Sequence, residues 1–157
     1  MGKREQTIDS IDNFVGDAIV AVFGVPVVKP DDAARAVACA VEMHNAMASV
    51  NAANGNKDLP PLDMGIGLNT GDAVAGNIGS DLRVKYSVIG SSVNIAARLE
   101  SLASGGQIFA SDATFAEARD IVRIAGHLNV KVKGVSGTIP VYEISGINGP
   151  FNVHRIG

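Results

Sequence analysis

The sequence contains no tryptophan, and aromatic residues make up only 4% of it. Large rings therefore cannot dominate the core, which must be built from Val, Ile, Leu and Ala. Hydrophobic residues reach 46% of the chain, which is enough for this purpose. A length of 157 residues fits one domain with a single sizeable core.

Cysteine is almost absent as well, since Cys39 is the only one. A disulfide within the chain is therefore excluded. Cys39 lies in an apolar stretch with helical periodicity, which indicates a buried thiol in a reducing compartment. We accordingly expect a cytoplasmic location.

Long hydrophobic runs and clusters of one charge are also missing. The longest nearly apolar run, residues 19–28, is interrupted by Gly24 and Pro26 and is too short to span a bilayer. The basic first residues are not followed by an apolar segment, so no signal peptide is expected. A net charge of −3 and the lack of a Lys/Arg-rich run argue against nucleic acid as a partner.

Apolar periodicity and turn residues predict an α/β domain over residues 1–145 and a tail at residues 146–157. Helices are expected at residues 32–53, 92–102 and 112–118. Strands are expected at residues 7–15, 18–23, 62–69 (continuing into or pairing with 72–75), 84–89, 107–110, 121–128, 130–133 and 139–144.

Residues 86–100, YSVIGSSVNIAARLE, carry the most informative pattern. A short β-like segment reaches a turn at Gly90, and either Ser91 or Ser92 can then cap a helix through its hydroxyl. Apolar side chains recur along this helix at i, i+4 and i+7 and predict a buried stripe: Ile95, Leu99 and Leu102.

Asn94 and Arg98 are also four residues apart, so they project together from another face of the same helix. A carboxamide beside a guanidinium suits an anionic, oxygen-rich ligand, because arginine offers a fork of donors and keeps its charge. Taken alone, such a pair is more often a solvated helix face than a binding site.

Two glycine-containing segments precede this helix. Residues 12–24, DNFVGDAIVAVFG, predict a hairpin with Asp17 at its tip, where the carboxylate either meets a cation or is solvated. In residues 62–80, LDMGIGLNTGDAVAGNIGS, Gly65 and Gly67 alternate with apolar residues. This alternation indicates a strand whose backbone is closely approached by another element. The segment contains no phosphate-binding loop motif.

These three segments, together with residues 130–144, VKVKGVSGTIPVYEI, resemble the catalytic domain of class III nucleotidyl cyclases. The resemblance extends from about residue 8 to residue 144. It implies an α/β (α+β sandwich) domain related to the ferredoxin-like fold. It also implies an enzyme that cyclises a nucleoside triphosphate to a 3′,5′-cyclic monophosphate with release of pyrophosphate, at a site shared within a homodimer or with a partner cyclase domain. We expect an adenylate cyclase, which forms 3′,5′-cyclic AMP from ATP.

The resemblance also implies roles for individual residues. Asp17 matches a metal-binding aspartate, and the family's metals are two Mg²⁺ or Mn²⁺ ions. Asn94 matches the residue that orients the ribose, and Arg98 matches the one that stabilises the transition state. Lys133 matches the lysine that contacts the triphosphate.

Asn13 and Ser87 match the positions that read the base. Adenylate cyclases of the family commonly have Lys at the first position and Asp, Thr or Ser at the second, whereas guanylate cyclases commonly have Glu at the first. The amide of Asn13 both donates and accepts, so it can pair with adenine or guanine. Ser87 favours ATP.

The chain departs from the family at its start. The family's first metal-binding aspartate lies in an N-terminal strand with the pattern F-x-D-[IL]-x-G-[FY]-[ST], and no such segment occurs here. The fold is therefore expected to be incomplete at the N-terminus, with one of the two metal-binding aspartates missing. Three alternatives stay open: a guanylate cyclase, a catalytically silent regulatory or nucleotide-binding domain, and an interaction domain without a ligand.

Overall fold

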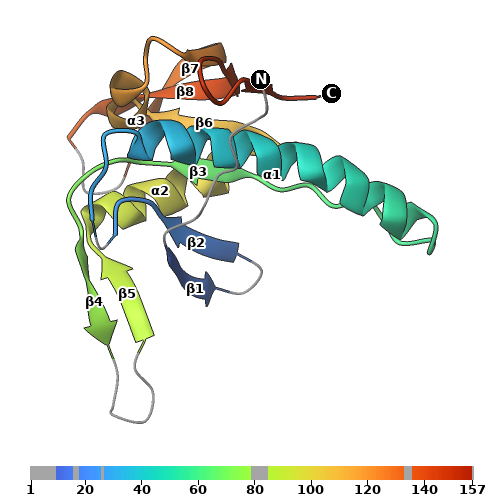
Figure 1. Cartoon of the computed structure of the whole chain (residues 1–157), viewed down its shortest axis with the longest axis horizontal. Helices are drawn as coiled ribbons and strands as arrows, with labels where there is room; N and C mark the ends of the chain where they lie inside the picture. Colours follow the sequence, from blue (N-terminus) through green and yellow to red (C-terminus); the bar gives the residue numbers. More distant parts are fainter. Residues whose placement is uncertain (1–9, 16–17, 26, 79–84, 133–135, 157) are drawn as a thin grey trace.

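A computed structural model describes residues 10–15, 18–25, 27–78, 85–132 and 136–156; for residues 10–15, 74–78 and 85–89 it describes the backbone. Within these residues the chain forms a mixed α/β structure, which confirms the predicted fold class (Figure 1). The helices are α1 (Asp32–Gly55), α2 (Ser91–Leu102) and α3 (Asp112–Glu117). The strands are β1 (Ser10–Val15), β2 (Ala18–Val22), β3 (Ile66–Leu68), β4 (Val74–Ile78), β5 (Lys85–Ile89), β6 (Ile108–Ser111), β7 (Val122–Lys131), β8 (Thr138–Ile147) and β9 (Val153–His154).

The main sheet has the strand order β3-β6-β8-β7, and β9 pairs with β8. β3 and β6 run parallel, whereas β8 is antiparallel to β6, β7 and β9. The parallel pair requires a crossover connection, and the segment from β4 to α2 provides it. The predicted hairpin of β1 and β2 and a second hairpin of β4 and β5 lie together in the lower part of Figure 1.

The first half of α1 packs on the main sheet because its inward face consists of small apolar residues. Val37 and Val41 are fully buried there, against Ile144 and Ile147 of β8. The buried face does not continue along the whole helix, since Ala48 is exposed. The C-terminal end of α1 extends past the sheet in Figure 1.

A second cluster of apolar side chains lies under α2. Leu99 is fully buried, with Ile95 and Leu102 partly buried beside it, which confirms the predicted stripe. The stripe packs against Phe109 of β6 and Val141 of β8. This packing fixes which face of α2 is left for solvent or a ligand.

The close approach predicted at Gly65 and Gly67 is confirmed, because the backbone of α2 lies directly against Gly67 and that of its C-cap residue Ala103 against Gly65. The strand itself is shorter than the predicted residues 62–69. The backbone of Leu62 is bonded to the side chain of Asn51, with Asn51 Nδ2 to Leu62 O at 2.9 Å and Leu62 N to Asn51 Oδ1 at 2.7 Å. This segment is therefore attached to α1 rather than to a neighbouring strand.

The two strands predicted at residues 121–128 and 130–133 differ from the structure, where β7 is one strand ending at Lys131. Asn129 stays in register opposite Pro140 of β8. Irregularities in register between Arg123 and Gly126 bend the strand without ending it.

The segment predicted as a tail packs on the domain instead. Phe151 is 2% exposed and Val153 4%, and both belong to the main core. The side chain of Asn45 in α1 also holds this segment, because it donates to His154 O and accepts from Ile156 N, each at 2.9 Å. Residues 151–156 are therefore held on the core by buried apolar side chains and by hydrogen bonds to α1. We call residues 151–156 the C-terminal strap.

Candidate active site

The helix α2 presents Asn94 and Arg98 on its exposed side. β5 reaches α2 through Gly90, which adopts a φ of 145° that favours glycine. Asn94 and Arg98 are both exposed, while Leu99 on the inner face is buried. The structure therefore brings the carboxamide and the guanidinium to the same side of one helix, as their spacing predicts, and their chemical roles stay predictions.

The start of α2 differs from the prediction in one respect. Gly90 occupies the N-cap position, and no side chain caps the helix. The hydroxyl of Ser92 instead donates to the carbonyl of Asp72, at 2.8 Å. Ser92 thus joins α2 to the loop that follows β3, rather than closing the helix's own first turn.

The two residues predicted to read the base lie on neighbouring hairpins. Asn13 is in β1, opposite Val20, and Ser87 is in β5, opposite Gly76. β1 and β5 contact each other, and β5 also contacts α2. The elements that carry Asn13, Ser87 and the α2 pair therefore meet in one region of the molecule (Figure 1).

Asp17 and Lys133 fall outside the described residues, so the structure does not place them relative to α2. The described residues alone contain no group of three or more His, Cys, Asp or Glu side chains that could hold a metal ion. They do not by themselves make up the expected Mg²⁺ or Mn²⁺ site, and binding of a metal by Asp17 stays a prediction.

A polar cluster behind α2 was missed by the sequence reasoning. Asn69 follows β3, and its side chain is bonded to Ser92 in α2 and to Ser111 at the end of β6. Thr70 is bonded through its hydroxyl to the buried Thr114, at 2.8 Å. The signal in the sequence was the Asn-Thr-Gly step directly after a strand, where hydrogen-bonding side chains are common.

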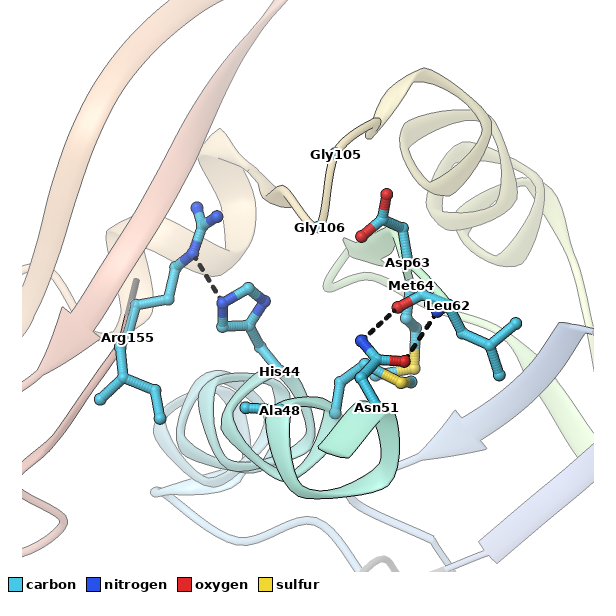
Figure 2. A pocket seen from close by; sticks show the side chains of 11 residues that line it. His44, Ala48, Asn51, Leu62, Asp63, Met64, Gly105, Gly106 and Arg155 are labelled. Carbon is cyan, nitrogen blue, oxygen red and sulfur yellow. Dashed lines mark hydrogen bonds between the residues drawn. The ribbon is translucent and has the colours of Figure 1, made fainter. Parts of the chain in front are cut away.

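A pocket of about 210 Å³ lies elsewhere, between α1, residues 62–64, the turn at Gly105 and Gly106, and the C-terminal strap (Figure 2). On one wall Arg155 Nε donates to His44 Nε2 at 3.1 Å. Arg155 also forms an ion pair with Glu143, at 3.4 Å. Asn94 and Arg98, the two predicted site residues whose side chains the structure describes, do not line this pocket.

No helix in the described part of the chain is long and apolar enough to cross a membrane.

Comparison with known proteins bears on the identity of the chain. Residues 4–146 match the family model described as "Adenylate and Guanylate cyclase catalytic domain". The chain is 31% identical over 150 residues to Adenylate cyclase 1 of Rhizobium meliloti (strain 1021), a match that covers 94% of this chain and 23% of that protein. It is 40% identical over 125 residues to an adenylate cyclase of Mycobacterium bovis, with coverage of 78% and 27%.

A solved structure is similar as well. The crystal structure of the guanylyl cyclase Cya2 matches with a TM-score of 0.89 and 46% sequence identity, over 94% of this chain and 75% of that one. The chain spans about a quarter of the length of the two curated relatives, 23% and 27%. The family match covers most of the chain, and the protein therefore belongs to the family of adenylate and guanylate cyclase catalytic domains.

Proposed function

We propose that this domain cyclises ATP to 3′,5′-cyclic AMP with release of pyrophosphate. The observation that supports the proposal most directly is the exposed pair of Asn94 and Arg98 on α2, beside the strand that carries Ser87. An arginine in this setting supplies a permanent positive charge to an anionic ligand. The adenylate cyclases among the relatives support ATP as the substrate.

The proposed reaction forms a bond from the 3′-oxygen of the ribose to the α-phosphorus. It breaks the bond from that phosphorus to the oxygen that bridges the α- and β-phosphorus atoms, and this oxygen leaves with the bonding electron pair as part of pyrophosphate. The 3′-hydroxyl loses its proton to water in the process. Asn94 would orient the ribose, and Arg98 would stabilise the negative charge that develops on the phosphoryl oxygens. Lys133 would contact the triphosphate. Asp17 would bind a divalent ion, whose chemistry is neutralisation of phosphate charge.

The preference for ATP over GTP is proposed to be modest. Asn13 offers both a donor and an acceptor, so it fits either base edge, and Ser87 tips the balance towards adenine. A guanylyl cyclase is among the similar solved structures, so turnover of GTP is the main alternative.

We also propose that the complete site is shared between two cyclase domains. In the described part of the chain β3 is the last strand of the main sheet, and β2 pairs with β1 alone. Unpaired strand edges favour association with another chain. Sedimentation in the presence of nucleotide should show a dimer, and a monomer at high concentration would contradict the shared site.

A catalytically silent domain is the second candidate. Asp17 is the one metal-binding aspartate that the family resemblance assigns here, and two divalent ions need more than one negative ligand. Residues 1–157 on their own are therefore expected to be nearly inactive.

A cyclase assay with Mn²⁺ and either ATP or GTP tests both candidates. It should compare residues 1–157 with the same residues preceded by a segment that carries a second metal-binding aspartate. Turnover that requires the added segment would support the proposed enzyme. Lack of turnover in both, with nucleotide still bound, would support the silent domain. Strong activity of residues 1–157 alone would mean that another carboxylate of this chain, such as Asp12 or Asp72, acts as the second metal ligand.

A further inference from the structure

Three glycines hold α2 unusually close to the chain segment that contains β3. A methyl group on Gly71 would collide with Ser92 Oγ, one on Gly67 with the backbone of Ala96 and Glu100, and one on Gly65 with the carbonyl of Ala103. The contacted residues recur along α2 at helical spacing, so they define one face of the helix. α2 therefore lies along β3 with its backbone against the strand (Figure 1).

A carboxamide fixes the first turn of α2 at one end of this contact. Asn69 Nδ2 donates to the carbonyl of Ser92, at 2.9 Å, and Asn69 Oδ1 accepts from Ser111 Oγ, at 2.6 Å. Ser111 is 5% exposed and is also the N-cap of α3. One side chain thus connects α2 to the end of β6.

The loop that carries Asn69 is itself anchored to the core. The hydroxyl of Thr70 is bonded to that of Thr114, which is 1% exposed. Ser92 Oγ also donates to Asp72 O, which joins this loop to α2 a second time. Because Thr114 lies in the core, the loop has little freedom to follow a movement of α2, and it acts as a fixed support.

We propose that Asn69 is a positioning residue that sets the rotation and axial position of α2, and through them the direction of Asn94 and Arg98. Ser92 lies two residues before Asn94, so a shift of the first turn displaces Asn94 directly. A misplacement of about 1 Å can lower a rate about 100-fold. This inference rests on the proposed function for its catalytic consequence, but the structural part does not depend on turnover.

Hydrogen exchange of the α2 amides tests the structural part on the full chain. Asn69→Ala removes both hydrogen bonds and is expected to speed exchange in α2 about tenfold or more relative to α1. Asn45→Ala is the matched control, since that carboxamide also makes two hydrogen bonds but connects α1 to the C-terminal strap. It should leave exchange in α2 unchanged.

Two substitutions separate the hydrogen bonds from side-chain volume. Asn69→Asp keeps the size and the acceptor for Ser111 but places a carboxylate oxygen against the Ser92 carbonyl, so it should loosen α2 as much as Asn69→Ala does. Ser111→Ala removes the other half of the link. Combined with Asn69→Ala, it should add little to the exchange rates in α2, because both changes break the same connection. The loss of the α3 N-cap should appear in the amides of α3 instead.

The catalytic consequence is measured in a form of the protein that turns over nucleotide. Asn69→Ala should lower kcat about 10- to 100-fold with KM changed less than about threefold, while Asn45→Ala keeps both. Unchanged exchange in α2 would overturn the proposal, and so would equal losses of kcat in the two variants, which would indicate a general loss of stability. If Asn69→Ala speeds exchange in α2 but the wild-type protein has no turnover, the proposed function is contradicted and the positioning role stands.

Discussion

Arg98 and Leu99 are neighbours in the chain, yet Arg98 is exposed and Leu99 is fully buried. Consecutive residues of an α-helix point about 100° apart, so a helix packed on one side presents adjacent residues to different surroundings. Leu99 packs on Phe109 and Val141, and Arg98 takes no part in that cluster. The chemistry assigned to Arg98 can therefore be tested without disturbing the core.

Replacement of Arg98 by alanine should reduce kcat strongly in a form of the protein that shows turnover. A donor that acts mainly on the charge of the transition state is worth about 100- to 1,000-fold in kcat, while KM changes little. Steady-state kinetics with ATP measures both parameters.

Arg119→Ala is the control for this experiment, because the Arg119 guanidinium lies over the ring of Phe115, 5.4 Å from its centroid, outside α2. It should leave both parameters close to wild type. Loss of nucleotide binding in Arg98→Ala with turnover preserved would show that Arg98 binds the ground state instead.

Base selectivity should respond to residue 13. Asn13→Lys replaces a group that both donates and accepts with one that only donates, and should raise the ratio of kcat/KM for ATP over GTP about tenfold or more, as one charged hydrogen bond allows. Parallel assays with the two nucleotides give this ratio. A wild-type domain that uses GTP faster than ATP would refute the proposed preference.

The C-terminal strap should be essential for stability. Phe151→Ala empties a site in the main core and should lower the free energy of unfolding by about 3–5 kcal/mol. Ile156→Ala, in the same strap but 58% exposed, should change it by less than about 0.5 kcal/mol. Urea denaturation measures both variants, and similar small effects would mean that the strap does not hold the core together.

The thiol of Cys39 should make stability depend on alkaline pH. Burial, with a smaller effect from the carboxylate of Glu42, raises the pKa of Cys39 above its ordinary value of 9.0. The Cys39 thiol then ionises at a lower pH in the unfolded chain than in the folded one. Its stabilising contribution to the free energy of unfolding is therefore complete below pH 9.0 and is lost as the pH rises towards the raised pKa.

Comparison with Cys39→Ala isolates this contribution. The difference in free energy of unfolding between wild type and Cys39→Ala should shrink as the pH rises above 9.0. A thiol reagent should also label native Cys39 slowly, since the side chain is buried. A difference that is constant with pH would contradict the raised pKa.

Local patterns in the sequence were enough to predict most elements of the fold. The spacing of Ile95, Leu99 and Leu102 predicted the buried side of α2, and the alternation around Gly65 and Gly67 predicted a backbone in close contact. These features depend on helix and strand periodicity, which short stretches of sequence carry by themselves. The four-residue separation of Asn94 and Arg98 likewise predicted that they share one face of the helix, and the structure shows that both are exposed.

Only the tertiary structure decided what each surface packs against. Phe151 and Val153 alternate with Asn152 and His154, a pattern too short to show that the strap closes the core over α1. The role of Asn69 depends on Ser111, which is 42 residues away in the chain. A side chain that joins two distant elements leaves no local pattern, because its partners are brought together by the packing of the sheet rather than by their neighbours in sequence.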